Sequence, residues 1–592
     1  MAGYQAPTDD MLYLIGELLD AEAALAPLAG EAAPLALMGD VLREAGKFCA
    51  EIVQPLNQPG DIEGCRLENG VVRTPAGFAA AYGAFVEAGW PGLAHDPAHG
   101  GQGLPRVLQI LLDEMMSSAN FAFGLFPGLT HGAVEAIARH AEPALQEIYL
   151  PKMVAGTWTG AMALTEAHAG SDLGLLRTKA EPAGDGSYRI TGSKIFISAG
   201  DHDLAENIIH LVLARLPGAP PGTRGISLFL VPKFLPGADG GLGARNELSV
   251  GSLEHKMGIK ASPTCVMNYD GARGWLIGAP HRGLAAMFTM MNAERLFVGV
   301  QGLGVAEAAY QGAASYARER RQGRAGGAPG DGAGPQPILE HPDVRKMLLT
   351  MRAFTEAGRA LAVWTALELD KAARHPDPAE RADAEGLVAL LTPVIKAAFS
   401  DLGFEAAVLG QQVFGGHGYV REHGMEQLVR DVRIAQLYEG TNGIQAMDLV
   451  SRKLQLENGT LPARFFALVR QTIGAGGAIA GADPIVAPLG EALDRLEGAT
   501  ARLLARSAAD PHEAGAAATD YLKLFALVAL GWMWARMACH ALALGEAAQP
   551  LHRRKLALAR FFMARILPQT VALDGALAAG AAPVMALEAD AF

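Results

Sequence analysis

Apolar residues recur at helical spacing through the first part of the chain. In "LPRVLQILLDEMM" they place Leu108, Leu111, Leu112 and Met115 on one face. The stretches "TPAGFAAAYGAFVEAG" and "THGAVEAIARHAEPALQEIYLPKMVAG" have a similar pattern. These patterns predict an N-terminal helical domain over residues 1–157.

The pattern changes near residue 158 to short, β-branched and partly alternating runs. "SYRITGSKIFIS", "NIIHLVLARL" and "RGISLFLVPKF" are separated by Gly, Pro, Asp and Asn, which predicts a β domain over residues 158–285. Helical periodicity returns over residues 286–455. It is broken at 325–337 by "AGGAPGDGAGPQP", for which we expect a mobile surface loop.

Residues 456–592 are rich in Ala and Leu and predict an additional helical domain. The fold class is therefore α+β, mostly α. The run "LFALVALGWMWA" has 12 residues between Lys523 and Arg536, too short to cross a bilayer, and it predicts a buried helix.

Charge and cysteine usage narrow the classes of function. The chain has 592 residues, and its 62 acidic and 49 basic side chains give a net charge of −13, which argues against general nucleic-acid binding. The four cysteines lack metal-ligand spacing, and the start "MAGYQAPTDDML" is acidic, unlike a signal peptide. We expect a cytoplasmic protein without a membrane span.

A break between two helical patterns carries a candidate acid or base. In "RIAQLYEGTNGIQ", Asn442 and Gln445 are typical of a capping box, so Glu439 lies in a tight inter-helix break. The free N–H groups of the following helix hold an anion well. A solvated loop carboxylate explains the same spacing.

Two stretches of the β domain suit a flat or phosphorylated ligand. "TGAMALTEAHAGSD" (159–172) ends in small residues, which allow close approach to backbone N–H groups. In "KIFISAG" (194–200), Phe196 and Ser198 share one strand face, so a ring and a hydroxyl would meet a heteroaromatic group together. A core phenylalanine beside a surface serine is the alternative.

Two further motifs lie in the second helical region. "YARERRQGR" (316–324) concentrates arginines, which either complement a solvated helix end or bind a pyrophosphate. "GQQVFGGHGYV" (410–420) ends a helix in a Gly-Gly turn, where we expect His417 to be a turn residue. We expect no metal site.

In order and spacing, "AMALTEAHAGSD", "KIFISAG", "QQVFGGHGYV" and "LYEGTNGIQ" resemble the acyl-CoA dehydrogenase family across residues 40–455. The opening "YQAPTDDMLYLIGELL" and the helical extension resemble its longer, C-terminally extended subfamily, which includes 3-methylmercaptopropionyl-CoA dehydrogenases. The resemblance implies an N-terminal helical domain, a middle β domain and a C-terminal four-helix bundle with FAD between them, plus an extra C-terminal helical domain.

The resemblance also implies the residues that contact FAD. Phe196 stands where the family usually has Trp, and Ser198 where it usually has Thr; Gly443 replaces a frequent Gln. The implied cofactor residues are Met162, Leu164, Thr165, Gly170, Ser171, Phe196, Ser198, Arg320, Gln322, Gln412, Gly415, Gly416 and Thr441.

At the reacting centre, the resemblance makes Glu439 the catalytic base that takes the α proton of an acyl-CoA while the β hydride goes to flavin N5. The family's thioester oxygen meets the glutamate's own backbone N–H and a ribityl hydroxyl of FAD. The implied substrate contacts are Ser171, Asn292 (often Asp in relatives), Arg295, Tyr438 and Gly440.

The implied function is fatty-acid β-oxidation with electrons passed to an electron-transfer flavoprotein. A homo-oligomer is expected, with a dimer favoured because the extra domain would cover the face that shorter relatives use to form tetramers. An acyl-CoA oxidase and a DNA-associated flavoprotein are the alternatives. The latter has support only from "HRRK" (552–555), for which we expect an exposed helix face. Acyl chain length and the presence of sulfur in the chain stay open.

Overall fold

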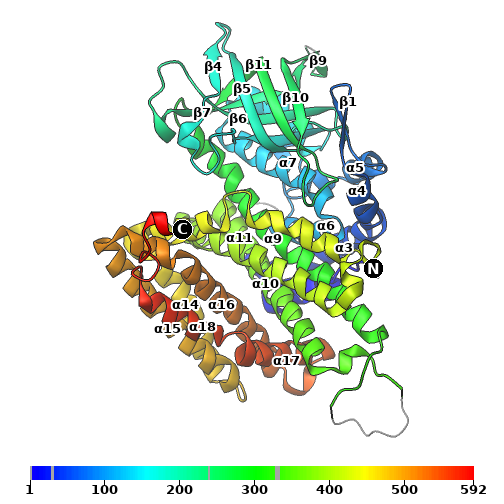
Figure 1. Ribbon diagram of the computed structural model, residues 1–592, viewed down its shortest axis with the longest axis vertical. Coiled ribbons are helices and arrows are strands. Elements are labelled where there is room, and N and C mark those ends of the chain that lie inside the picture. The colour runs from blue at the N-terminus through cyan, green and yellow to red at the C-terminus, as the bar shows by residue number, and fades with distance from the viewer. Residues whose placement is uncertain (1–2, 29–32, 238–239, 327–333) are drawn as a thin grey trace. The chain divides into compact units, whose positions relative to one another are not determined.

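The computed structural model describes residues 3–28, 33–237, 240–326 and 334–592. Most of the expected loop 325–337 lies outside the described residues, because 327–333 fall between them. The chain divides into two compact units (Figure 1). Unit 1 comprises Met1–Gly46, Pro105–Ser118 and Val298–Phe592, and unit 2 comprises Lys47–Leu104 and Ala119–Phe297. The four-domain boundaries expected from the sequence stay a prediction.

Unit 2 contains the strands, including the three predicted runs, which form β5, β6 and β7. Its helices are α4 (Asn57–Glu63), α5 (Phe78–Glu87), α7 (Phe121–His140) and α8 (Pro143–Val154), and α9 (Gly283–Glu319) starts here. Its strands are β1 (Arg66–Glu68), β2 (Val71–Arg73), β3 (Trp158–Ala163), β4 (Lys179–Pro182), β5 (Tyr188–Ser198), β6 (Asn207–Arg215), β7 (Ile226–Pro232), β8 (Phe234–Pro236), β9 (Leu242–Arg245), β10 (Leu248–Leu253) and β11 (Thr264–Ile277).

The large sheet of unit 2 closes on itself. Its path runs β10-β11-β5-β4-β6-β3, and β7 joins β11 to β6, so that β11, β5, β4, β6 and β7 form a ring. Inside it, side chains such as Phe229, Val212 and Met267 are buried. Helix α7 packs on β3, and Gly160 N–H donates to the Thr130 hydroxyl at 3.1 Å. The closed sheet gives the end of β3 and the middle of β5 a rigid support.

Two histidines lie inside unit 2 as neutral hydrogen-bonding groups. His210 binds the Tyr269 hydroxyl through Nδ1 and Gly200 O through Nε2, each at 2.8 Å. His202 Nε2 lies 3.0 Å from the Thr159 hydroxyl. Burial lowers the pKa of His210 to about 4, and burial together with the Lys233 charge lowers the pKa of His202 to about 3.

Acidification is expected to destabilise unit 2 through these histidines. An unfolded histidine has a pKa of about 6.5, so only the unfolded state takes up the proton as the pH falls from 6.5 towards 4. The free energy of unfolding should therefore fall, by about 2 kcal/mol for His210 at pH 4.5. Denaturant titrations at pH 7.5 and 4.5 measure this, and His210→Gln should remove that share. If the free energy of unfolding had the same pH dependence in the wild type and in His210→Gln, the contribution of His210 would be contradicted.

Unit 1 is helical. Its helices are α1 (Thr8–Tyr13), α2 (Ala21–Leu25), most of α3 (Leu35–Phe48) and of α6 (Arg106–Ala119), the rest of α9, α10 (Pro342–Arg374), α11 (Pro378–Phe414), α12 (Met425–Val432), α13 (Asn442–Ser451), α14 (Leu461–Gly477), α15 (Asp483–Ala509), α16 (Pro511–Ala543), α17 (Pro550–Arg565) and α18 (Gln569–Ala579). The predicted face of α6 is confirmed, because Leu108, Leu111, Leu112 and Met115 are all buried.

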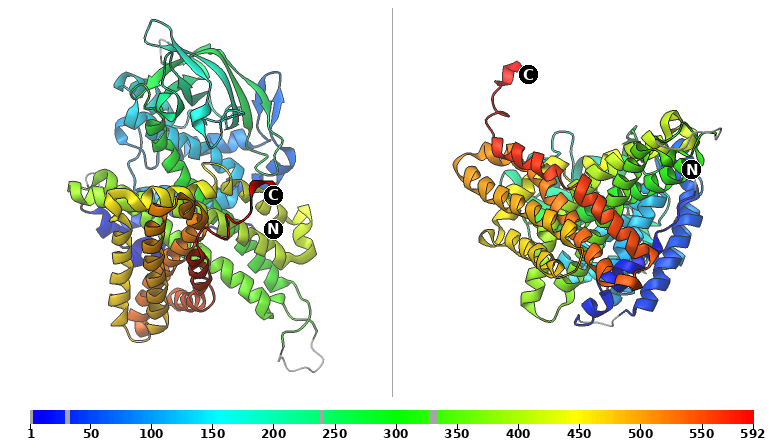
Figure 2. Two further views of the ribbon diagram at one scale, coloured as in Figure 1. Left: turned by 60° about the vertical axis from the view of Figure 1, so that its left-hand side comes forward. Right: turned by 90° about the horizontal axis from the view of Figure 1, so that it is seen from below.

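The helices after residue 460 form a further layer on the bundle. Helices α14, α15, α16 and α18 run side by side (Figures 1 and 2), and α16 contacts α10, α11 and α13. Pro511 follows the N-cap Asp510, whose carboxylate accepts from His512 N–H at 2.9 Å. Residues 524–535 are all buried, so the predicted buried helix is confirmed.

The expected exposed face at "HRRK" is wrong for two of the four residues, although Arg553 is exposed. His552 and Lys555, both on α17, are 3% and 0% exposed. Lys555 is ion-paired with Asp10 and Glu356, which lie on α1 and α10. Periodicity alone did not reveal these partners, because they are hundreds of residues away in the chain.

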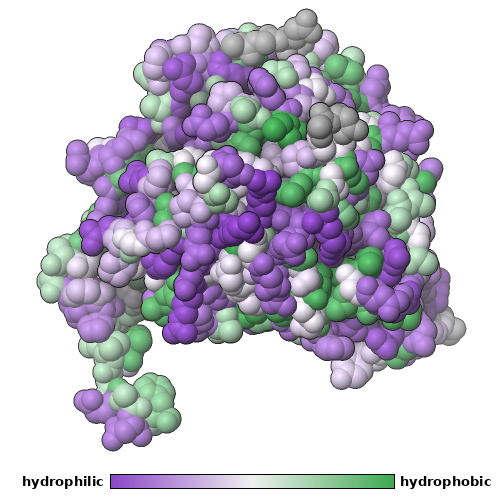
Figure 3. Space-filling view, turned by 90° about the horizontal axis from the view of Figure 1, so that it is seen from above, coloured by the Kyte–Doolittle hydropathy of each residue, from purple (hydrophilic) through white to green (hydrophobic). Residues whose placement is uncertain are grey.

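Four helical segments among the described residues are long and apolar enough to cross a membrane by length and composition: Phe121–His140, Pro378–Tyr419, Pro511–Ala543 and Pro550–Ala579. The protein itself buries 78%, 72%, 83% and 33% of their apolar windows, respectively. An apolar helix enclosed by protein does not need lipid. On the face shown in Figure 3, hydrophilic and hydrophobic residues are interspersed. The expected absence of a span stays a prediction.

Candidate active site

Glu439 lies in a short break of unit 1 between the end of η11 (Arg433–Gln436) and α13. Its backbone has φ +57°, and Gly440 follows with φ +81°. A left-handed glutamate costs on the order of 1–3 kcal/mol, and such strain clusters at functional sites. The side chain is half-buried, and its Oε2 atom is buried. The structure therefore supplies a reason, independent of the sequence, to treat Glu439 as functional.

The helix after this break is capped differently from the sequence expectation. Thr441, rather than Asn442, is the N-cap of α13, and its hydroxyl accepts from Ile444 N–H at 3.3 Å. Gln445 does not complete a capping box. Its amide donates instead to Glu439 O (3.1 Å) and Gly440 O (3.3 Å). The predicted capping box is therefore wrong, because the left-handed turn brings these carbonyls to Gln445.

The residues beside the glutamate are fixed as well. The Tyr438 hydroxyl donates to Gln301 Oε1 on α9. Gly440 has the left-handed backbone that favours glycine. Gly443 is exposed on the first turn of α13.

In unit 2, the end of β3 leads into the small-residue turn. Met162 and Thr165 are half-buried, Leu164 is buried, and Gly170 and Ser171 are exposed. No atom lies within 4 Å of the position that a Cβ on Gly170 would occupy, so its backbone is accessible. The turn therefore suits the close approach that the sequence predicted.

A buried ion pair holds the β3 exit. Lys194 Nζ on β5 donates to Leu164 O (2.8 Å) and to Glu166 Oε1 (2.9 Å), and both side chains are buried. Burial opposes the charge of Glu166, but Lys194 and hydrogen bonds from Thr178 and Arg177 hold its pKa near 2. Ile195 N–H donates to Thr165 O at 2.9 Å. Sequence reasoning missed this pair.

Phe196 lies in a bulge of β5. The register with β11 shifts between Lys194 and Ile197, and Phe196 has φ +60° with a side chain 59% exposed. Bulges re-aim side chains and are frequent beside active sites. The alternation behind the expected shared face of Phe196 and Ser198 is interrupted here, and Ser198 is half-buried.

The predicted dinucleotide residues come together in unit 1, where the end of α9 meets the end of α11. Tyr316 stacks on Phe414 with ring centroids 4.1 Å apart, and its hydroxyl lies 2.7 Å from His417 Nδ1. His417 is thus tied into a turn, as expected. The five predicted residues on these two ends are all exposed: Arg320, Gln322, Gln412, Gly415 and Gly416.

Asn292 and Arg295, two of the implied substrate contacts, lie in unit 2 on the first part of α9. Arg295 is 5% exposed, and its Nη1 lies 3.5 Å from Asn292 Oδ1, near the limit of a hydrogen bond. The neighbouring Glu294 is also buried. Sequence reasoning did not select Glu294, although a buried carboxylate in a helix is unusual.

One group of described side chains has the spacing of metal ligands: the ligand atoms of Glu17, His540 and His552 lie within 4.8 Å of one another. His552 Nδ1 accepts from Gln549 N–H (3.0 Å), so the ring proton sits on Nε2 and points to Glu17 at 2.9 Å. A metal ion on Nε2 would force that proton onto Nδ1, against the N–H group. His552 forms the capping box of α17 with Gln549, and the expected absence of a metal stays a prediction.

Four segments of the chain match models of known protein domains. Residues 41–157, 161–272 and 281–454 match the N-terminal, middle and C-terminal domains of acyl-CoA dehydrogenases, and residues 465–588 match "Acetyl-CoA dehydrogenase C-terminal like". The 3-methylmercaptopropionyl-CoA dehydrogenase of Ruegeria pomeroyi is 45% identical over 95% of this chain and 96% of its own.

Two solved structures share the fold. ACDH-11 of Caenorhabditis elegans, in complex with C11-CoA, has a TM-score of 0.75 at 21% identity and covers 95% of this chain and 91% of its own. An acyl-CoA dehydrogenase of Bacillus anthracis, complexed with FAD, has a TM-score of 0.74 at 20% identity, covering 93% and 90%. The four domain matches and the Ruegeria relative show that the chain belongs to the acyl-CoA dehydrogenase family, in the form that carries an extra C-terminal domain.

Proposed function

We propose that this chain oxidises an acyl-CoA thioester to the trans-2-enoyl-CoA, with Glu439 as the catalytic base, and passes the electrons to an electron-transfer flavoprotein. Family membership makes the chain an FAD-dependent oxidoreductase. The assignment of the base rests on the strained, left-handed backbone of Glu439. Hydrogen bonds hold the chain at this point, from Gln445 to Glu439 O and from the preceding Tyr438 to Gln301.

The residues expected around FAD suit it chemically. The exposed ring of Phe196 offers a flat apolar surface, and the accessible backbone at Gly170 offers N–H donors. The exposed guanidinium of Arg320 matches a pyrophosphate. Bound FAD supplies the acceptor for the β hydride.

Glu439 takes the α proton in this proposal. The carboxylate is half-buried, and ligand binding would remove more water from it, which raises a carboxylate pKa towards the range where a base works best. The backbone N–H of Glu439 is the donor to the thioester oxygen that the family resemblance implies, and it lowers the cost of the charge that develops there. Tyr438 and Gly440, on either side of Glu439 in the chain, are the residues proposed to contact the thioester.

The name of the Ruegeria relative suggests a substrate class to test first. We propose a short acyl-CoA, with 3-methylmercaptopropionyl-CoA as the first candidate. Anaerobic bleaching of the flavin is measured with this compound, butyryl-CoA, octanoyl-CoA and palmitoyl-CoA, and mass spectrometry identifies the enoyl product. The experiment tests both the oxidation of acyl-CoA and the preference for a short acyl chain. The absence of bleaching by every compound would overturn the function, and oxygen consumption without an electron-transfer flavoprotein would indicate an oxidase.

Arg320→Ala is expected to weaken FAD binding by about ten- to a hundredfold, because a charge-assisted hydrogen bond to the pyrophosphate would be lost. The ratio of FAD to protein after gel filtration measures the effect. Arg324→Ala removes another exposed arginine of the same segment and should retain FAD. Equal FAD retention in the two variants would contradict the placement of Arg320.

Oligomeric state and location complete the proposal. Helix α16 covers the bundle face formed by α10, α11 and α13, which favours a dimer over a tetramer. Light scattering tests this, since a dimer has twice the 61.9 kDa mass of the chain. A cytoplasmic location is proposed from the scattered cysteines.

A further inference from the structure

Lys396 is a fully buried lysine in the middle of α11. Residues 391–400 are all buried, and Thr392, Lys396 and Ser400 are polar residues at successive i+4 positions among them. Residues four apart on a helix lie on one face, so they form a polar stripe inside an apolar helix. A buried ammonium is costly unless hydrogen bonds compensate it, and its partners therefore indicate its role.

Two hydrogen bonds of the Lys396 ammonium go to the segment that carries Glu439. Its Nζ donates to Gly440 O at 2.8 Å and to Asn442 Oδ1 at 2.9 Å. Asn442 is itself fixed, because its Nδ2 donates to Ser400 Oγ (3.0 Å) and Asp401 Oδ1 (2.7 Å). The polar stripe of α11 thus contacts Gly440 and Asn442, the first and third residues after Glu439.

We propose that Lys396 is a positioning residue for Glu439: its ammonium holds the Gly440 carbonyl and thereby keeps the glutamate in the left-handed conformation. The inference rests on the proposed function. Gly440 O accepts from Lys396 on one side and from Gln445 on the other. A strained residue persists only where its surroundings fix it. The two donors fix the peptide between Gly440 and Thr441, and Gln445 also binds Glu439 O, the carbonyl of the peptide before it.

The charge of Lys396 acts together with its hydrogen bonds. An ammonium one peptide away from Glu439 favours the carboxylate form of this side chain. Two other charged groups near this break in unit 1, Asp401 and Arg433, bind side-chain amides. Asp401 accepts from Gln436 and Asn442, each at 2.7 Å, and Arg433 donates to Gln436 at 3.0 Å. Lys396 thus places a positive charge in direct hydrogen-bond contact with Gly440 and Asn442.

Two substitutions separate position from charge. Lys396→Met removes both, whereas Lys396→Gln keeps an N–H donor for Gly440 O and removes the charge. Lys371→Met, on α10, is the matched control, because Lys371 pairs only with Glu368 on its own helix among the contacts described. All proteins are prepared as the full-length holoenzyme, and FAD content is checked first.

Hydrogen exchange tests the inference without any substrate. Peptides covering residues 436–446 should exchange at least about tenfold faster in Lys396→Met than in the wild type, and peptides elsewhere in α11 should not. Lys396→Gln should restore part of the protection. Unchanged exchange over 436–446 in both variants would overturn the inference. If Lys396→Met does not fold, the comparison of Lys396→Gln with the wild type decides.

Single-turnover reduction of the flavin tests the link to the base. At saturating acyl-CoA, the rate should fall about 30-fold or more in Lys396→Met, and the pH of half-maximal rate should rise by about one unit in both variants. A rate and pH profile equal to those of Lys371→Met would overturn the role in catalysis. A wild type that no acyl-CoA reduces would overturn the proposed function, while the exchange result would still decide on Lys396.

Discussion

Replacing Glu439 with glutamine is expected to leave FAD bound and to slow reduction of the flavin by acyl-CoA by about a thousandfold or more. Glutamine has nearly the same shape and keeps the backbone N–H, but its amide is not a base for the α proton. The contacts of Glu439 O and Gly440 O with Gln445 involve backbone carbonyls, so the substitution leaves them in place. Stopped-flow absorbance under anaerobic conditions measures the rate.

Glu457→Gln is a matched control for this experiment. Glu457 is also a left-handed glutamate between two helices of unit 1, with φ +51°, but it pairs with Arg464 and lies outside the predicted site. Its variant should reduce the flavin at the wild-type rate. Substantial reduction by Glu439→Gln, with FAD content equal to that of the control, would remove Glu439 from the role of base.

The elements of the fold were predictable because they depend on local patterns. The short β-branched run "NIIHLVLARL" predicted β6, and helical spacing around Leu111 predicted α6. The apolar run of α16 predicted burial, although the helix extends over Pro511–Ala543 and is much longer than that run. The closure of the sheet was not predictable, because β7 pairs not only with the preceding β6 but also with β11, which lies far away in the sequence.

The sequence indicated which residues belong to the candidate site, but not the backbone conformations that these residues adopt. The left-handed backbone of Glu439 and the bulge at Phe196 contradict the ordinary preferences of these residue types. Hydrogen bonds from elsewhere in the fold, such as that of Lys396, hold the first of them. A polar stripe in an apolar helix was the available signal for Lys396, and it indicates a buried network without naming its partner.

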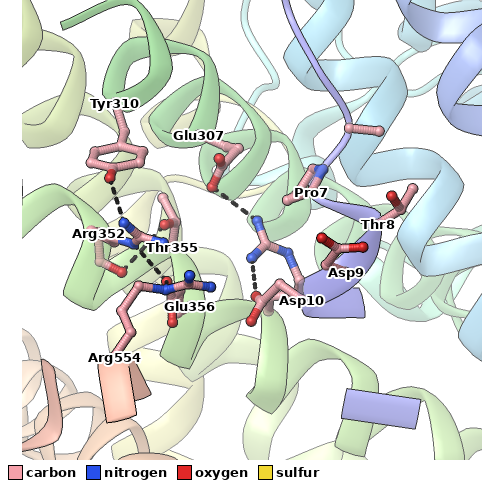
Figure 4. A pocket seen from close by; sticks show the side chains of 12 residues that line it. Pro7, Thr8, Asp9, Asp10, Glu307, Tyr310, Arg352, Thr355, Glu356 and Arg554 are labelled. Atoms are coloured by element: carbon pink, nitrogen blue, oxygen red, sulfur yellow. Dashed lines mark hydrogen bonds and ion pairs between the residues drawn. The ribbon is translucent and has the colours of Figure 1, made fainter. Parts of the chain in front are cut away.

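Long-range ion pairs were also missed, and they tie the two extensions of the chain together. Asp10 lies before the region that matches the N-terminal family domain, and Lys555 lies in the extra C-terminal domain. Asp10 is ion-paired with both Lys555 and Arg359 of α10, in a buried cluster of which Figure 4 labels Asp10, Glu307 and Glu356. The N-terminal segment is thus paired directly with the additional domain, which explains physically how both extensions support one bundle.

The cluster around Arg359 has the charges arranged for mutual compensation. Arg359 donates to Asp10 at 2.5 Å, to Glu114 at 2.9 Å and to Glu307 at 2.9 Å, and it is 1% exposed. Burial opposes the charge of Asp10, yet Lys555 and Arg359 lower its pKa to about 2. For Glu114, burial outweighs the effect of Arg359 and raises the pKa to about 7. Removing the arginine would leave three buried carboxylates short of positive charge.

Arg359→Met is therefore expected to lower the free energy of unfolding by about 3–5 kcal/mol, because breaking a buried ionic group leaves uncompensated charge. In the variant the folded carboxylates would have pKa values raised above those of the unfolded chain, so the deficit should grow as the pH rises from 5 to 8. Denaturant midpoints at both pH values measure it. Arg352→Met is the control, since Arg352 is more exposed and pairs with Glu356, and it should cost only about 1 kcal/mol. Equal denaturant midpoints for Arg359→Met and Arg352→Met at pH 8 would contradict a large contribution of the Arg359 cluster to stability.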